Sequence, residues 1–157
     1  MNKMHLLSAL LLLAIAGCQP DELVDVIVPG DECGSSGARV EATIDGSDWC
    51  ANASVLAIGD GGTVMITGIN ALGTTLVLQV DSIGLGPQPI TEASNALMYL
   101  SLGLPYTPLN SDPGQLIIAT LDTAARRITG AFEVTLHADG GGSRPVSGAF
   151  DVQYTQQ

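Results

Sequence analysis

The folded part of this chain is predicted to be all-β, a single antiparallel β-sandwich or flattened barrel of about eight strands. Two observations lead to this prediction. Hydrophobic residues recur at every second position, the period of a strand that turns one face to the core. Turn residues separate these segments about every ten residues, a spacing typical of sandwiches and barrels. A helical turn is considered only within residues 91–98, so helices are not expected to organise the fold.

The end of the chain carries the clearest alternation, over residues 128–138 and 144–154. The positions expected to face the core are Ile128, Phe132, Val134 and Leu136 in the first segment and Val146, Phe150, Val152 and Tyr154 in the second. Asp139 and three following glycines suit a tight turn, so the two segments are predicted to form a hairpin. Both contain a Gly-Ala-Phe sequence, at 130–132 and 148–150. Each glycine is interpreted as a bend or a close backbone approach.

Earlier strands are shorter, and turn residues again mark their ends. They are predicted over residues 39–44, 49–58, 63–70, 74–82, 96–102 and 115–122. The turns between the first of them are Asp45-Gly46, Asp60-Gly61-Gly62 and Gly73. Segments 83–95 and 103–114 are rich in Gly, Pro, Asn and Ser and are expected to be irregular.

The first eighteen residues predict export and lipidation. Lys3 precedes an apolar run over residues 6–16. This run is shorter than the roughly 20 residues that cross a bilayer, and it has the length of a signal-peptide core. Ile15-Ala16-Gly17-Cys18 resembles the lipobox of bacterial lipoprotein precursors, which implies cleavage before Cys18 and acylation of its thiol and new amino group. An ordinary signal peptide with an incidental cysteine is the alternative.

The expected organisation is a signal peptide over 1–17, the lipidated Cys18 with an acidic spacer over 18–37, and the all-β domain over 38–157. Residues 23–28 are apolar enough to add an edge strand.

Several acyl chains hold a protein stably on a membrane. In some sorting rules, an Asp directly after the lipidated cysteine retains a lipoprotein at the inner membrane. Here that residue is Gln19, which resembles the signal for the outer membrane. The expected location is the cell envelope, on the periplasmic or the surface side.

Charge restricts the partners. Without the leader, four arginines and sixteen acidic residues remain, a net charge of −12. Such a chain repels phosphate backbones, so no nucleic-acid partner is expected. The expected partners are the membrane, through the lipid, and an envelope protein or glycan.

Two further cysteines, Cys33 and Cys50, remain as a pair in an oxidising compartment. They are predicted to form a disulfide bond that pins the end of the spacer to the first hairpin. Free thiols are the alternative. Zinc is a poor fit, because His137 is the only histidine left to assist them.

Residues 40–49, Val-Glu-Ala-Thr-Ile-Asp-Gly-Ser-Asp-Trp, resemble the opening of a family of small uncharacterised envelope lipoproteins with an A-x-I-D-G-x-x-W/F strand and turn. The resemblance extends to Ile66-Thr67-Gly68, to residues 118–122 and to the twin G-x-F strands. It implies the fold and assigns no catalytic residue. The cysteine pair departs from the family pattern.

Known catalytic and cofactor motifs are not found, so no enzyme activity, cofactor or metal is expected. His137 is expected on a solvated strand face. Asp45 and Asp48 flank a turn and suit a turn better than a calcium ion. A carboxylate-based hydrolase is the weakest hypothesis, and its candidate acids border the irregular segments: Asp81, Glu92 and Asp112.

The few aromatic residues are the candidates for a recognition surface. Tyr99 and Tyr106 flank the segment 103–114, and Trp49 beside Cys50 is either a stacking platform or packed on the disulfide. Two functions stay open: a non-enzymatic structural, adhesive or partner-binding module, and a carrier of a small ligand or sugar. A side-chain-filled interior favours the first, and an internal cavity of about 300 Å³ or more favours the second.

Overall fold

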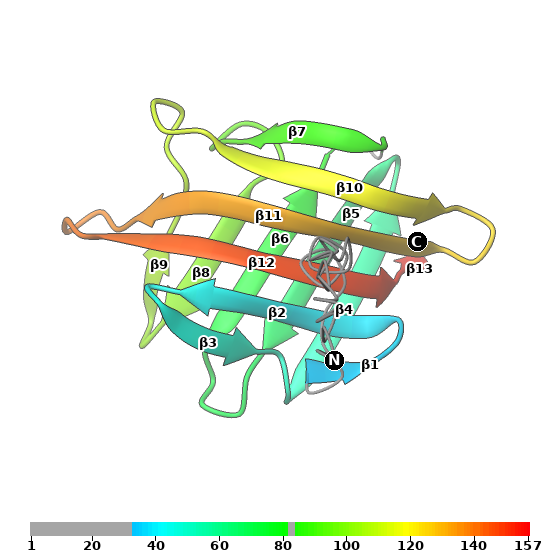
Figure 1. Cartoon of the computed structure of the whole chain (residues 1–157), viewed down its shortest axis with the longest axis horizontal. Coiled ribbons are helices and arrows are strands. Elements are labelled where there is room, and N and C mark those ends of the chain that lie inside the picture. The colour runs from blue at the N-terminus through cyan, green and yellow to red at the C-terminus, as the bar shows by residue number, and fades with distance from the viewer. Residues whose placement is uncertain (1–32, 82–83) are drawn as a thin grey trace, which may run out of the picture.

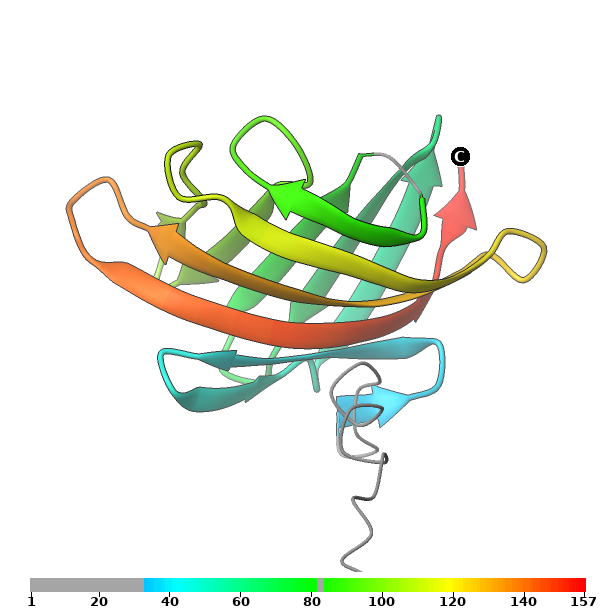
Figure 2. The same ribbon diagram turned by 45° about the horizontal axis from the view of Figure 1, so that its top comes forward.

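A computed structural model describes residues 33–81 and 84–157. These residues form two β-sheets packed face to face, with no α-helix among them (Figure 1). The turned view in Figure 2 shows the two sheets as separate layers, so the all-β sandwich is confirmed and a closed barrel is not formed. The predicted signal peptide, Cys18 and the possible strand over 23–28 lie outside the described residues.

The seven-stranded sheet contains both long strands from the end of the chain. Its order is β1 (Gly34–Ser35), β2 (Ala38–Ile44), β12 (Ser143–Gln153), β11 (Arg127–His137), β10 (Gly114–Asp122) and β7 (Gly86–Ile90), and β3 (Ser47–Cys50) also pairs with β2. All of these pairs are antiparallel. Pro87 and Pro89 lack an N–H group and lie on the outermost strand β7, where a missing donor costs no ladder hydrogen bond.

The six-stranded sheet is built from the middle of the chain. Its order is β13 (Thr155–Gln156), β4 (Ser54–Asp60), β5 (Thr63–Ile69), β6 (Thr75–Val80), β8 (Leu97–Ser101) and β9 (Leu104–Tyr106). The pairing of β13 with β4 is parallel, and the other pairs are antiparallel.

The predicted hairpin is confirmed, because β11 and β12 pair from Arg127–Gln153 to His137–Ser143. In this register Gly130 lies opposite Phe150, and Phe132 lies opposite Gly148. A Cβ atom on Gly148 would lie 2.6 Å from the Phe132 ring, and one on Gly130 would lie 2.7 Å from the Phe150 ring. Each glycine therefore leaves room for the phenylalanine of the other strand, so the close approach, one of the two interpretations of the repeat, is the one that the structure shows.

The core fills the space between the two sheets with aliphatic and aromatic side chains. The largest fully buried ones are Phe150, Ile66, Leu76, Leu78, Ile90, Leu97, Leu116, Ile118, Ile128 and Leu136. They come from alternate positions of the strands in both layers, as the period of two requires.

Three parts of the predicted layout are wrong. Residues 49–58 are not one strand: β3 ends at Cys50, and β4 begins at Ser54 in the other sheet. The segments expected to be irregular contain β7 and β9, and residues 91–98 form a bend and the start of β8 in place of a helical turn. Strands β7 and β9 are short and carry Gly or Pro, so their alternation is not visible in the sequence. In the described part of the chain, no helix is long and apolar enough to span a membrane.

Candidate functional site

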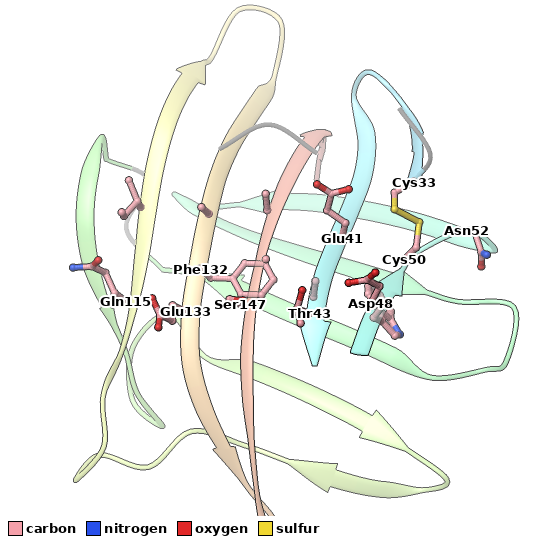
Figure 3. Close-up of a pocket in the computed structure, with 16 residues that line it drawn as sticks. Cys33, Glu41, Thr43, Asp48, Cys50, Asn52, Gln115, Phe132, Glu133 and Ser147 are labelled. Atoms are coloured by element: carbon pink, nitrogen blue, oxygen red, sulfur yellow. A yellow bond between two sulfur atoms is a disulfide. The ribbon is translucent and has the colours of Figure 1, made fainter. Parts of the chain in front are cut away.

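The outer face of the seven-stranded sheet contains a hollow of about 750 Å³, which we call the outer-face hollow. Strands β10, β11, β12, β2 and β3 contribute its lining (Figure 3). Small residues form its floor, namely Ala131, Gly148 and Ala149. Larger side chains on both sides of this floor create the depression.

Strand register explains the arrangement of the lining. Directly paired residues on neighbouring antiparallel strands share one face of a sheet. One outward row runs Ile117, Ala131, Ala149, Glu41, Cys50, and the next runs Gln115, Glu133, Ser147, Thr43, Asp48. The hollow therefore has a mostly apolar row beside a fully polar one, both running across the strands.

A second hollow of about 490 Å³ continues the polar row. It shares Thr43, Gln115, Glu133 and Ser147 with the first and reaches Pro113 and Pro145. The two hollows together form an elongated depression, open to solvent, across the sheet.

Three carboxylates give the outer-face hollow its charge. Figure 3 shows Glu133 and Gln115 on one side of the hollow and Glu41 and Asp48 on the other. Among the residues that the structure describes, neither hollow is lined by a lysine, arginine or histidine. The depression is consequently suited to a ligand that is cationic or rich in hydrogen-bond donors.

The predicted disulfide is present at one edge of the outer-face hollow. Cys33 and Cys50 are bonded, with their Cα atoms 5.4 Å apart. Because Cys50 lies at the end of β3, the bond fixes the point at which the N-terminal segment joins the domain.

A buried ion pair flanks the hollow on the next outward row. Asp151 lies at an outward position of β12, between the core residues Phe150 and Val152, but it is only 1% exposed. Arg127 covers it with two hydrogen bonds, Nε to Oδ1 at 2.7 Å and Nη2 to Oδ2 at 2.6 Å. An outward strand position therefore does not leave this carboxylate solvated.

The ionisation of Asp151 follows from its neighbours. Burial by itself would raise the pKa of Asp151, but hydrogen bonds and charge from Arg127, the backbone N–H of Gly37 and the charge of Arg39 together lower it. The same contact raises the pKa of Arg127. Asp151 thus stays ionised as a structural group, and Arg127 also donates to the Ser36 hydroxyl at 2.7 Å.

The three aromatic residues proposed as a recognition surface do not form a common exposed surface. Trp49 is buried, and its Nε1 donates to the Thr74 hydroxyl at 2.7 Å. It points away from Cys50, its neighbour on β3, so neither the stacking platform nor packing on the disulfide is found. Tyr99 is buried beside the half-buried Tyr106, with ring centroids 6.2 Å apart.

Tyr106 is also covered on its ring face. The Arg144 guanidinium lies 4.8 Å from the ring centroid, and Arg144 approaches Asp45 at 3.6 Å. The pKa of Arg144 is raised, chiefly by Tyr106. Asp45 adopts a positive φ of 53°, as its predicted role in a turn requires.

The acids considered for hydrolysis are dispersed among different neighbours. The Asp81 carboxylate accepts from the backbone N–H of Asn95 at 2.8 Å. Glu92 accepts from the Asn110 amide at 3.1 Å. The Asp112 carboxylate lies 3.4 Å from Nε2 of His137. The sequence predicts a solvated His137 side chain, but this side chain is half-buried.

Sequence reasoning misses the outer-face hollow altogether. The one available signal is the alanine between glycine and phenylalanine in both copies of the repeat. Ala131 and Ala149 pair across β11 and β12, so two small outward residues meet at the centre of the sheet. Recognising them as a floor requires the register, which one sequence does not supply.

Comparison with known protein families gives a match over most of the domain. The profile of a family described as "Domain of unknown function (DUF6252)" matches residues 36–151. No curated protein and no solved structure matches the chain.

Proposed function

The chain belongs to the family described as Domain of unknown function (DUF6252), and we propose that this protein is a non-enzymatic binding module held on the cell envelope by lipid on Cys18. Its partner is an extended, basic segment of another envelope protein, received in the outer-face hollow. The observation that carries this proposal is the acidic, solvent-open depression across five strands.

The shape of the depression supports an extended partner. The two hollows share four lining residues and run across the strands, so a stretched chain can contact several side chains in succession. Asp48 and Glu133 would face lysine or arginine, while Ala131, Ala149 and Ile117 would contact the aliphatic parts of these side chains.

The interior supports a binding module over a carrier. Large buried side chains from both sheets meet in the core, including Phe150, Ile66 and Leu116. A carrier of the kind considered from the sequence would need its cavity there. A small cationic ligand in the outer-face hollow remains compatible with the same lining, and competition experiments distinguish it.

The exposure of the carboxylates supports a non-enzymatic role. A general acid that works near neutral pH needs a desolvated carboxyl group. Asp48 and Glu133 are exposed at the rim of the outer-face hollow, and Asp151, the one well-buried acid in the described part of the chain, is held by Arg127.

Peptide binding tests the proposal on the processed, full mature protein in detergent. Fluorescence anisotropy should detect ten-residue extended peptides with alternating lysines and should detect no binding of matched glutamate peptides. Glu133→Gln should weaken binding about two- to fivefold, the effect of an exposed ion pair. Ser147→Arg, which fills the exposed centre of the outer-face hollow, should abolish it.

Asp139→Asn is the matched control, because Asp139 is an exposed acid in the β11–β12 turn and does not line the depression. It should leave binding unchanged. Equal affinity for basic and acidic peptides, or binding that Ser147→Arg does not affect, would overturn the proposal. Hydrolysis of a glycoside or ester that Glu133→Gln abolishes would instead establish an enzyme.

A further inference from the structure

Three leucines protrude from one end of the six-stranded sheet. Leu72, in the β5–β6 turn, is 89% exposed, and Leu102, in the β8–β9 turn, is 97% exposed. Leu104, at the start of β9, is 58% exposed. We call these three residues the leucine tips.

Register places both turns at the same end of the sheet. Ile69 pairs with Thr75 across the β5–β6 turn, and Thr75 pairs with Leu100 at the end of β8. The two turns therefore project side by side from neighbouring strands, along the lower edge of the molecule in Figure 1.

This end of the sheet is uncharged, although the chain is strongly acidic. Residues 61–80 and 93–111 contain no charged side chain. The acids of this part of the chain, Asp60, Asp81 and Glu92, lie at the opposite end: Asp60 pairs with Thr63, and the other two follow β6 and precede β8. Negatively charged head groups would repel most of this protein's surface, but they would not repel the leucine tips.

The N-terminal segment joins the domain close to the leucine tips. It ends at Cys33, which is bonded to Cys50. Two residues further, the Asn52 side chain accepts a hydrogen bond from the backbone N–H of Ala71 at 2.8 Å, next to Leu72. Trp49 bonds to Thr74 in the same turn. A chain leading back to a membrane would start from this side of the molecule.

We infer that the leucine tips insert into the interfacial region of the bilayer to which the protein is anchored, so that the domain lies on the membrane with this end down. The inference rests on the proposed lipid at Cys18. The chain between Cys18 and Cys33 spans at most about 50 Å, so the anchor brings the tips within reach without imposing an orientation. Exposed leucines on chain segments that carry no charged residue supply the orientation, because they leave water when they enter the acyl boundary.

Depth-dependent fluorescence quenching tests this orientation. Leu72→Trp and Leu102→Trp are made in the full chain, and the processed proteins are reconstituted into phosphatidylcholine vesicles with brominated acyl chains. Trp49 is the only native tryptophan, and its emission in the unmodified protein is subtracted. Both introduced tryptophans should lose fluorescence, most strongly with bromine near the head groups, and their emission should shift to the blue.

Leu85→Trp is the matched control, because Leu85 is 70% exposed and lies beyond β6 at the opposite end of the sheet. It should keep its fluorescence and its red-shifted emission. Equal quenching at 72 and 85, or none at 72, overturns the inference. A blue shift without quenching, together with a doubled mass in sedimentation that Leu72→Asp abolishes, would identify a second copy as the occupant and also overturn it.

Mass spectrometry of the same preparation separates the two ways of failing. Acyl chains on Cys18 without quenching at 72 and 102 would reject the docking orientation alone. A mature protein without acyl chains would reject the anchor, and the docking orientation with it.

Discussion

Asp151 shows how a single residue departs from what strand alternation predicts. The alternation places it correctly on the outward face of β12. Its burial arises from neighbours in register: Asp151 pairs with Arg39 on β2 and Thr129 on β11, and Arg127 bends over the carboxylate. A carboxylate that accepts hydrogen bonds from a guanidinium and a backbone N–H resists protonation, which is why its pKa is lowered despite burial.

We expect Asp151→Asn to lower the free energy of unfolding by about 2 kcal/mol at pH 7, the usual value of hydrogen bonds to a charged group. Because the folded-state pKa is lowered, the contribution of Asp151 is complete above the unfolded carboxyl value of about 4 and is lost as the pH falls through the folded value. Urea unfolding at pH 7 and at pH 3 should therefore show a difference between wild type and variant that shrinks at the lower pH. Glu133→Gln, at an exposed position of the same face, should change stability by less than about 0.5 kcal/mol.

Paired glycine and phenylalanine residues set the spacing within the β11–β12 hairpin. The sequence is sufficient to predict this element, since two eleven-residue strands with strict alternation and a glycine turn leave few alternatives. For the repeated glycines it leaves two interpretations, a bend or a close backbone approach. It does not predict that each phenylalanine fills the space of the opposite glycine, because that pairing depends on the register.

Gly148→Ala tests this pairing. The new methyl group would meet the Phe132 ring and the backbone oxygen of Glu41, so we expect a loss of about 1–3 kcal/mol from overpacking. Gly140→Ala is the control, because Gly140 lies in the turn with no atom near its Cβ position. Combining Gly148→Ala with Phe132→Leu should cost less than the sum of the single changes in thermal unfolding. Additive costs would show that the two residues do not share the space.

At the scale of the whole molecule, the alternation predicts two layers and a filled core, but it does not assign strands to layers. Residues 49–58 are the clearest case: they look like one strand, and the chain crosses from one sheet to the other between Cys50 and Ser54. The candidate site escapes prediction for a related reason. Ala131, Ala149, Glu41 and Glu133 come from three strands, and only sheet order brings them together.

The Cys33–Cys50 bond closes a loop with a sequence separation of 17 and fixes the start of the domain. Its reduction should lower the free energy of unfolding by about 3 kcal/mol, the value expected for a loop of this size. A Cys33→Ser, Cys50→Ser double variant should show the same loss and no response to reductant. Mass spectrometry without reduction should recover the two cysteines in one linked peptide pair, and two alkylatable thiols in the envelope protein would contradict the bond.

We expect attachment to the envelope to depend on one thiol, that of Cys18 at the end of the lipobox-like sequence. Cys18→Ser should block radiolabelled palmitate incorporation and move the protein from the detergent phase to the aqueous phase, because acyl chains supply the stable membrane affinity. The domain itself lies far along the chain and should be unaffected, so the circular dichroism of the variant should retain its strand signal. The leucine tips alone should not hold the variant on membranes after a high-salt wash, since a few exposed side chains bury much less apolar surface than several acyl chains. A variant that still partitions into detergent would show that the anchor is not the lipid.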